Sequence, residues 1–377
     1  KVNTSLFSEE IGFVLQASSA DSDEIISSFS KNNIFASKIA SLADEDLTIR
    51  KDGEILFSKS INSLEKYWRE TSHAIQSIRD NKEIADSELN LLDKKEFTGL
   101  SSNISFDESQ IQQINSLTSS PKVAILREQG VNGQNEMAAA FTLAGFEAVD
   151  VHMQDLLDRN ISLKEFQGMA VCGGFSYGDV LGAGGGWSKT VIYNTNVKEQ
   201  FEQFFQDQAK FTLGVCNGCQ MLSNLKEIIP DAKHWPNFKR NLSDQFEARL
   251  AQVKIEKTNS VLLENMEGWM VPVASAHGEG RASFKNNDLE ELKASNQVAM
   301  KFVDSAGESS EIYPINPNGS PDGITGITAA NGRITIMMPH PERVFRKHQM
   351  SWHDKDWEEF SPWMQIFVNA RNFSQGS

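Results

Sequence analysis

One cysteine in this sequence stands where a covalent nucleophile would. Cys216 is the middle residue of Gly-Val-Cys-Asn-Gly (214–218), between an apolar run at 211–215 and a helix-like run at 219–225. The two glycines permit the sharp strand-to-helix turn of a nucleophile elbow, in which larger side chains would collide. The turn places the sulfur at a helix N-terminus, where the dipole and unpaired N–H groups favour the thiolate. The pattern therefore predicts covalent catalysis at a carbonyl carbon.

Two other interpretations of Cys216 remain open from the sequence. A cysteine after a core strand often has only a structural role. Cys216 and Cys219 also have the C-x-x-C spacing of redox and metal sites, but a zinc site needs two more ligands and the only other cysteine is Cys172. The flanking glycines favour the catalytic interpretation, and we expect no metal.

A candidate base lies about 120 residues further along the chain. His340 follows an alternating apolar run at 333–338, and Glu342 stands two places after it. In extended backbone both side chains share one face, and Pro339 and Pro341 favour extended backbone here. A carboxylate beside an imidazole orients the ring and raises its basicity, which predicts a Cys-His-Glu triad. A turn without catalytic function is the alternative.

His277, in Ala-His-Gly-Glu-Gly-Arg (276–281), is a rival base. The glycines on either side of Glu279 give a flexible loop, which would hold a base poorly. We expect His277 near the active site or in a domain contact, with a hydrogen-bonded loop histidine equally open.

Backbone N–H groups near Cys216 could stabilise an oxyanion. One donor is expected from Asn217, directly after the nucleophile, and a second from Gly174 or Phe175 in the glycine-rich loop at 172–179. A further glycine-rich stretch at 182–189 lacks the spacing of a phosphate loop or of a Rossmann turn. We expect a mobile loop there and no ATP binding in this half of the chain.

Short apolar runs alternate with helical stretches from residue 121 onward. This alternation predicts an α/β domain with right-handed βαβ units, a mostly parallel sheet and helices on both faces. Catalytic groups in such sheets lie at the carboxyl ends of the strands. The expected strands are 123–126, 148–151, 166–172 and 211–215, and the expected helices are 135–144 and 196–208.

The first 120 residues differ in character, because they are polar and charged. We expect a strand at 11–17, a helix after the acidic start at Asp21, a hairpin turning at Asp52–Gly53 and a helix ending near Asp80. These pieces are too few for an ordinary closed sheet, so they indicate a partial α+β segment. The first residues have neither a Met nor a signal-peptide core, and we interpret this end as a cut in a longer chain.

Composition sets the remaining limits. The 377 residues suffice for two domains, which we place at 121–377 and, as a remnant, at 1–80, joined by a docked linker at 81–120. The 36 basic and 51 acidic residues give a net charge of −15, which disfavours nucleic acid and anionic lipid as partners. No apolar run is long enough to span a membrane. Three cysteines fit a reducing compartment, and we expect a cytoplasmic protein.

These motifs resemble the class I, triad-type glutamine amidotransferases, whose fold is flavodoxin-like. The resemblance is closest to the C-terminal glutaminase domains of the large, single-chain phosphoribosylformylglycinamidine synthases of purine biosynthesis. It covers residues 121 to about 350 almost continuously. The matching stretches are 127–133, 173–179, 182–187, 214–220, 276–281 and 339–343.

The resemblance implies roles for individual residues and partners. Cys216 would be the nucleophile that hydrolyses L-glutamine, His340 and Glu342 would complete the triad, and Gln220 would contact the substrate. Residues 1–120, including Trp-Arg-Glu-Thr-Ser at 68–72, look like the end of the synthetase region. The rest of the synthetase polypeptide would be the partner that receives ammonia. ATP and Mg²⁺ would bind in that missing region and no cofactor in this chain, so the full synthase reaction is not expected of this chain alone.

Overall fold

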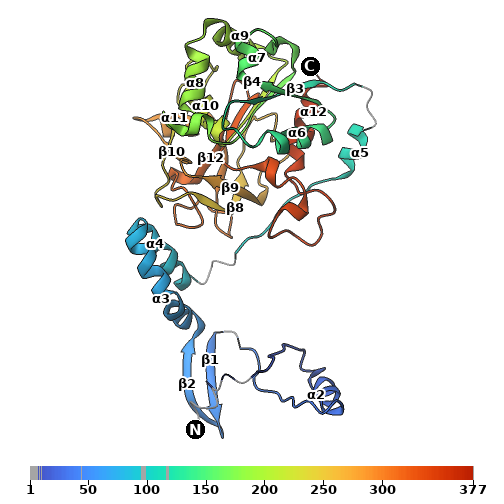
Figure 1. The fold of residues 1–377 in the computed structure, drawn as a ribbon, viewed down its shortest axis with the longest axis vertical. Helices are drawn as coiled ribbons and strands as arrows, with labels where there is room; N and C mark the ends of the chain where they lie inside the picture. Colours follow the sequence, from blue (N-terminus) through green and yellow to red (C-terminus); the bar gives the residue numbers. More distant parts are fainter. Residues whose placement is uncertain are drawn as a thin grey trace. The chain divides into compact units, whose positions relative to one another are not determined.

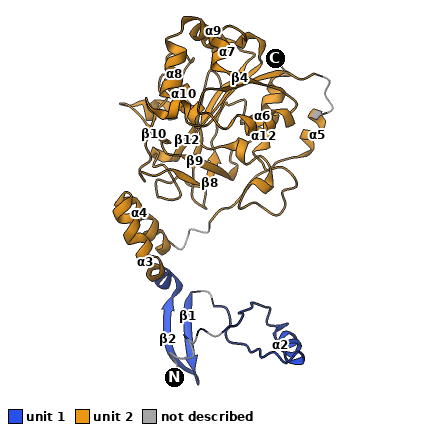
Figure 2. Cartoon of the chain, in the orientation of Figure 1, with its two compact units in different colours: residues 1–65 blue, residues 66–377 orange. Residues whose placement is uncertain are grey.

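The computed structural model divides the chain into two compact units, Lys1–Glu65 and Lys66–Ser377 (Figure 2). The structure describes residues 7, 9, 11–43, 45–94, 99–115 and 119–376. The parts of the expected linker at 95–98 and 116–118 therefore lie outside the described residues. Among the described helices, none combines the length and the apolar character that crossing a membrane requires.

The first unit contains the expected helix and hairpin. Helix α2 (Ser22–Lys31) follows the acidic start, and strands β1 (Asp46–Lys51) and β2 (Glu54–Ser60) pair antiparallel. Asp52 and Gly53 have φ of 51° and 86°. Two consecutive residues with positive φ are what a two-residue type I′ hairpin requires, so this prediction is confirmed.

The prediction of a strand at 11–17 is wrong. Ile11, Phe13 and Val14 are 104%, 94% and 83% exposed, and the segment pairs with no other described strand. An extended segment becomes a stable strand only when its N–H and C=O groups find partners. The apolar composition of this run was therefore insufficient evidence for a strand.

The helix expected to end near Asp80 is α3 (Ile61–Arg79). The segment expected as a linker begins with a further helix, α4 (Lys82–Asn90), which the weak periodicity of the sequence did not predict. Asn81 caps α4, since its side chain accepts a hydrogen bond from the N–H of Glu83 at 3.0 Å. The linker assignment is thus corrected at its start, because a good cap compensates for a poor apolar pattern.

The later part of the expected linker is docked, as predicted. The N–H of Ser101 donates to Oε1 of Gln252 at 3.1 Å, and Nε2 of Gln252 donates back to the carbonyl of Ser101 at 2.8 Å. Helix α5 (Ser109–Asn115) buries Ile111 and Ile114 in the core of the second unit. This segment is held by both hydrogen bonds and apolar contacts.

A nine-stranded sheet forms the centre of the second unit, with strand order β4-β3-β5-β6-β13-β12-β11-β8-β9. The three consecutive strands β5, β6 and β13 are buried along their whole length, as the apolar runs predict. The strands are β3 (Lys122–Arg127), β4 (Glu147–His152), β5 (Gly168–Val171), β6 (Phe211–Val215), β8 (Glu247–Ile255), β9 (Met270–His277), β11 (Val298–Phe302), β12 (Ile324–Ala329) and β13 (Ile334–Met337).

The strands β4, β3, β5, β6 and β13 are parallel to one another. In chain order this half of the sheet runs 2-1-3-4-5, which is the flavodoxin-like order expected from the sequence. The connections reverse direction between β3 and β5, and ligands bind at such switch points, beyond the carboxyl ends of the strands. The loops after β3 and β5 are therefore the place to look for a site.

The other half of the sheet is antiparallel. Strands β12, β11, β8 and β9 follow β13 in antiparallel pairs, so the whole sheet is mixed. A separate small sheet pairs β7 (Asn237–Lys239) with β10 (Arg281–Ser283). The α/β fold class is confirmed, and the antiparallel half is an addition that the sequence analysis did not predict.

Helices lie on both faces of the parallel half, as expected (Figure 1). Helix α6 connects β3 to β4, whereas α8 and α9 connect β5 to β6 in the opposite direction. Because such crossovers are right-handed, opposite directions place these helices on opposite faces. Helix α12 packs against α6, and α10 packs against α8. The helices are α6 (Gln134–Leu143), α7 (Met153–Leu157), α8 (Gly185–Ile192), α9 (Thr195–Gln206), α10 (Asn217–Asn224), α11 (Asp288–Ala294) and α12 (Met364–Phe373).

Candidate active site

Cys216 lies on a strained turn between β6 and α10, as the sequence predicts. Its backbone φ and ψ are 51° and −108°, a combination that residues other than glycine rarely adopt. A Cβ added at Gly218 would lie 2.0 Å from the carbonyl oxygen of Val171, and one at Gly214 would lie 2.5 Å from the Leu222 side chain. The close packing of this turn explains why only glycine fits on both sides of the cysteine.

His340 and Glu342 form a buried pair. Nδ1 of His340 lies 2.6 Å from Oε1 of Glu342, and the two residues are 1% and 0% exposed. The N–H of His340 donates to the carbonyl of Ala274 on β9 at 2.8 Å, which fixes the backbone at this point. Pairing between His340 and Glu342 was expected from their spacing.

The backbone that produces this pairing differs from the extended one expected. Pro341–Arg343 forms a 3₁₀ turn with His340 as its N-cap. Proline suits the first position of a helical turn because its missing N–H would have no partner there. The turn, rather than a shared strand face, brings the carboxylate back to the imidazole.

The structure places Cys216 and His340 on either side of Gly173. A Cβ added at Gly173 would lie 2.7 Å from Cε1 of His340 and 3.3 Å from Cβ of Cys216. Nε2 of His340, the ring nitrogen that Glu342 leaves free, has no hydrogen-bond partner among the described residues. It is available to the sulfur, so the three predicted triad residues lie together.

The charge state of His340 follows from these neighbours. Burial disfavours the imidazolium, but the charges of Glu342 and Cys216 outweigh burial and raise the pKa of His340 to about 10. The imidazole is therefore protonated at neutral pH, with the carboxylate on one side and the sulfur on the other. This arrangement supplies both a nucleophile and a proton donor.

Of the expected oxyanion donors, the structure rules out Phe175. Its N–H donates to the carbonyl of Gly130 at 2.9 Å and is already used. Asn217 is the first residue of α10, where an N–H has no partner within the helix. Gly174 has a φ of 149°. The carbonyl of the preceding residue, Gly173, is held by hydrogen bonds from the loop after β3. Asn217 and Gly174 remain the candidate donors.

Gln220 is 4% exposed and its amide is bonded at both ends. Nε2 donates to the carbonyl of Glu279 at 2.7 Å, and Oε1 accepts from Nδ2 of Asn217 at 3.2 Å. Gln220 therefore ties the nucleophile helix to the loop at 276–281. Contact with the substrate remains an expectation for this side chain.

His277 is buried and accepts a hydrogen bond at Nε2 from Nδ2 of Asn318 at 3.1 Å. Burial, reinforced by the nearby charge of His340, lowers the pKa of His277 to about 3. A neutral imidazole of such low basicity is a poor proton acceptor. The structure thus favours His340 over His277 as the base.

The C-x-x-C interpretation gains no support from the structure. Cys172, Cys216 and Cys219 are all free, and burial raises the pKa of Cys172 and Cys219 well above the usual thiol value. The described part of the chain contains no cluster of three or more His, Cys, Asp or Glu side chains that could hold a metal ion.

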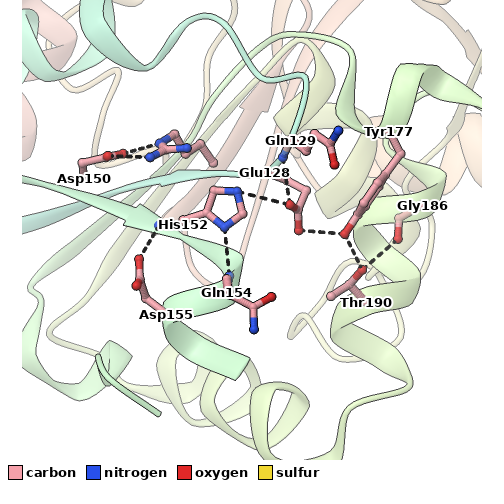
Figure 3. Close-up of polar contacts among 10 residues, drawn as sticks. Glu128, Gln129, Asp150, His152, Gln154, Asp155, Tyr177, Gly186 and Thr190 are labelled. Carbon is pink, nitrogen blue, oxygen red and sulfur yellow. Dashed lines mark hydrogen bonds and ion pairs between the residues drawn. The ribbon is translucent and has the colours of Figure 1, made fainter. Parts of the chain in front are cut away.

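A second group of polar residues, which the sequence patterns did not predict, lies at this edge of the sheet. Glu128, His152 and Tyr177 meet there, joined by contacts that Figure 3 shows. Glu128 and Tyr177 lie in stretches that carried the family resemblance, but neither was assigned a role. The only available signal was an acidic residue directly after a buried strand that ends at the switch point.

Gly173→Ala should disable the site while leaving the fold intact. The added methyl would lie between His340 and Cys216, and misplacing reacting groups by about 1 Å can lower a rate about 100-fold. We expect kcat for the reaction at Cys216 to fall by about that factor. Overpacking of this kind costs about 1–3 kcal/mol, which thermal unfolding would measure.

Gly278→Ala is the matched control, because a Cβ there would contact only the Phe246 ring at 3.8 Å. It should change kcat by less than about threefold, as expected of a substitution that displaces no reacting group. Equal losses in the two variants would contradict the placement of Gly173 between base and nucleophile.

Comparison with known proteins identifies the family of this chain. Residues 120–374 match the CobB/CobQ-like glutamine amidotransferase domain family. The fold resembles that of PurLQS from Thermotoga maritima, with a TM-score of 0.51 and 20% identity over 68% of this chain and 99% of that chain. A glutamine amidotransferase from Thermotoga maritima matches with a TM-score of 0.36 and 14% identity, over 59% of this chain and 77% of that one. Because the family match covers more than half of the sequence, the chain belongs to the CobB/CobQ-like glutamine amidotransferase domain family.

Proposed function

We propose that this chain hydrolyses L-glutamine at Cys216 and supplies the ammonia to a synthetase. The observation that carries the proposal is the position of Cys216, on a strained turn at the start of α10 and across Gly173 from the buried His340–Glu342 pair. Membership of the glutamine amidotransferase family supports glutamine as the substrate.

The proposed reaction begins with attack of the Cys216 thiolate on the carboxamide carbon of glutamine. The N–H groups of Asn217 and Gly174 stabilise the oxyanion, and one such donor is typically worth about 3 kcal/mol. His340 gives its proton to the departing amine, so that ammonia leaves and a thioester remains. His340 then takes a proton from water, which attacks the thioester, releases glutamate and restores the thiolate.

Glu342 holds His340 in place during both steps. Its carboxylate contacts Nδ1, so Nε2 is the nitrogen that exchanges the proton with sulfur, amine and water. It also keeps the imidazolium favourable in a buried setting. Glu342 thereby orients the base and sets its charge.

We further propose that the acceptor is formylglycinamide ribonucleotide, activated by ATP in a phosphoribosylformylglycinamidine synthase. The motifs at 173–179 and 276–281 support this choice among class I glutaminases, and the likeness of fold to PurLQS is consistent with it. The partner would then be the rest of the synthetase polypeptide. Three free cysteines fit a reducing compartment such as the cytosol.

ATP and Mg²⁺ belong to that partner in this proposal. Two glycines of the stretch at 182–189 serve packing, which supports a structural rather than a phosphate-binding role for this stretch. A Cβ at Gly184 would lie 2.5 Å from the backbone nitrogen of Met221 on α10, and one at Gly186 would lie 2.7 Å from the Tyr177 ring. The close approach of α8 to the nucleophile helix explains Gly184, and the close approach of α8 to Tyr177 explains Gly186.

Covalent labelling tests the proposal. The full chain is incubated with the glutamine analogue 6-diazo-5-oxo-L-norleucine, and its mass is measured before and after digestion. We expect one adduct, located on Cys216, and protection by excess glutamine. Absence of an adduct would favour a scaffolding role. If peptides prevented the labelling and glutamine did not, the result would favour a peptide hydrolase. Either result would overturn the proposal.

A further inference from the structure

A buried carboxylate lies next to the active site without belonging to the triad. Glu128 directly follows β3, at the switch point of the sheet, and is 5% exposed. Its Oε1 accepts a hydrogen bond from the N–H of Gln129 at 2.8 Å. A carboxylate buried to this degree is costly unless it is well bonded, so its other contacts matter for the stability of the loop.

Tyr177 supplies the second hydrogen bond to this carboxylate. Its hydroxyl lies 2.8 Å from Oε2 of Glu128 and 3.2 Å from Oγ1 of Thr190 on α8 (Figure 3). Burial, together with Glu128, raises the pKa of Tyr177, so the phenol stays protonated and donates to the carboxylate. The backbone of Tyr177 has a φ of 53°, which an unconstrained tyrosine rarely adopts.

His152, at the end of β4, is the third neighbour of Glu128. Its Nδ1 accepts a hydrogen bond from the N–H of Gln154 at 3.0 Å, so the ring proton lies on Nε2. Nε2 is 3.4 Å from Oε1 of Glu128 (Figure 3). The carboxylate is thus held from β4, from its own loop and from the loop after β5.

The loop of Glu128 also determines the orientation of one peptide in the site. The N–H groups of Asn132 and Gly133 both donate to the carbonyl of Gly173 at 3.1 Å. A trans peptide points its C=O and N–H in opposite directions. The N–H of Gly174 therefore points away from this loop, while Gly173 lies against Cys216 and His340.

Two further hydrogen bonds join the same loops. The N–H of Phe175 donates to the carbonyl of Gly130, and the N–H of Tyr177 donates to the carbonyl of Gln129, both at 2.9 Å. The Tyr177–Glu128 contact is the only one of these links that depends on two side chains. Substitution can therefore remove it without touching the backbone bonds.

We infer that Glu128 and Tyr177 are positioning residues that hold the Gly173–Gly174 peptide with its N–H available to the oxyanion. The inference rests on the proposed glutaminase function. Neither residue contacts the sulfur, so their effect acts through the loop. An interaction made only with the oxyanion lowers the barrier without changing substrate binding.

Two assays on the full chain separate this role from general damage. Glutamine hydrolysis passes through an oxyanion, whereas alkylation of Cys216 by iodoacetamide is a direct displacement that forms none. For Tyr177→Phe we expect kcat to fall about 10- to 100-fold with KM unchanged. The rate of alkylation at Cys216 should stay at the wild-type value.

Matched variants complete the test. Thr190→Val removes the other hydrogen bond of the Tyr177 hydroxyl and should leave kcat within about threefold of wild type. Glu128→Gln keeps one acceptor oxygen and should lose less than Tyr177→Phe. Because both residues act through one contact, the kcat of the double variant should be no lower than that of the more impaired single variant.

The outcomes distinguish the inference from the proposed function. An unchanged kcat in Tyr177→Phe, or equal losses in hydrolysis and alkylation, would overturn the positioning role. A wild-type chain that neither releases glutamate nor forms the Cys216 adduct would instead overturn the glutaminase proposal. Losses that simply add in the double variant would show that the two residues act separately.

Discussion

Cys216→Ala is expected to abolish glutamine hydrolysis, with kcat falling by about 10⁴-fold or more. Alanine fits the strained turn as well as cysteine does but cannot form the thioester. The measurement is release of glutamate by the full chain. In the intact synthetase, activity with free ammonia should survive, because ammonia bypasses the step at Cys216.

Cys219→Ala is the matched control for this prediction. Cys219 lies one turn along α10, is fully buried and has a thiol pKa raised by burial, so it takes no part in the chemistry. Its loss should leave kcat near the wild-type value and cost up to about 1 kcal/mol of stability through a small cavity. If Cys216→Ala kept normal glutamine hydrolysis, or Cys219→Ala lost it, the assignment of the nucleophile would fail.

The parts of the site that were predictable from the sequence are those encoded locally. The nucleophile elbow depends on two glycines within two residues of Cys216, and the spacing of His340 and Glu342 is equally short. The parallel strands β3, β4, β5 and β6 were predictable because they are short apolar runs that alternate with helical stretches. Local patterns of this kind carry their own structural meaning.

The parts that were not predictable depend on contacts between distant segments. The N–H of Phe175 is occupied because it donates to the carbonyl of Gly130, which lies 45 positions earlier and in another loop. The contact of Glu128 with Tyr177 joins residues 49 positions apart. No periodicity or motif reports which backbone groups will meet in a folded chain, so such contacts require coordinates.

The antiparallel half of the sheet was missed for a different reason. Strands β8 and β9 mix buried residues with partly or fully exposed ones and contain polar side chains such as Gln252 and Ser275. Their sequences lack the continuous apolar runs that identified the parallel strands. The run at 11–17 shows the opposite error, since its apolar residues are exposed and unpaired.

Glu342→Gln is expected to change the pH dependence of the reaction as well as its rate. In the wild type, burial acts against the imidazolium, and Glu342 is the largest of the groups that outweigh it and raise the pKa of His340 to about 10. Glutamine is close in shape and can still accept a hydrogen bond from Nδ1, but it carries no charge. The pKa of His340 should therefore fall.

The sign of the change follows from the role of the proton. His340 must be protonated to release ammonia, so the alkaline limb of the kcat/KM profile, which reports the pKa of the free enzyme, should lie near pH 10 in the wild type and shift towards acid in Glu342→Gln. At neutral pH a smaller fraction of the His340 imidazole would be protonated in the variant, and kcat should fall by up to about 10²- to 10⁴-fold, the usual range for loss of acid–base catalysis.

Stability should change with pH in the same direction. Because the folded pKa of His340 lies above the ordinary value of 6.5, the pair stabilises the native state fully below that pH, and the contribution is lost as pH rises through about 10. Denaturant unfolding at several pH values should therefore show wild type and Glu342→Gln converging in alkaline solution.

Glu279→Gln separates this effect from any loss of negative charge near the site. Glu279 lies in the neighbouring loop at 276–281, and the groups that raise the pKa of His340 do not include it. Its replacement should leave the alkaline limb in place, whatever its effect on KM. If both variants shifted the limb equally, the charge of His340 would be set by the general field of the site rather than by its contact with Glu342. An unshifted limb in Glu342→Gln would mean that another group supplies the proton to the departing ammonia.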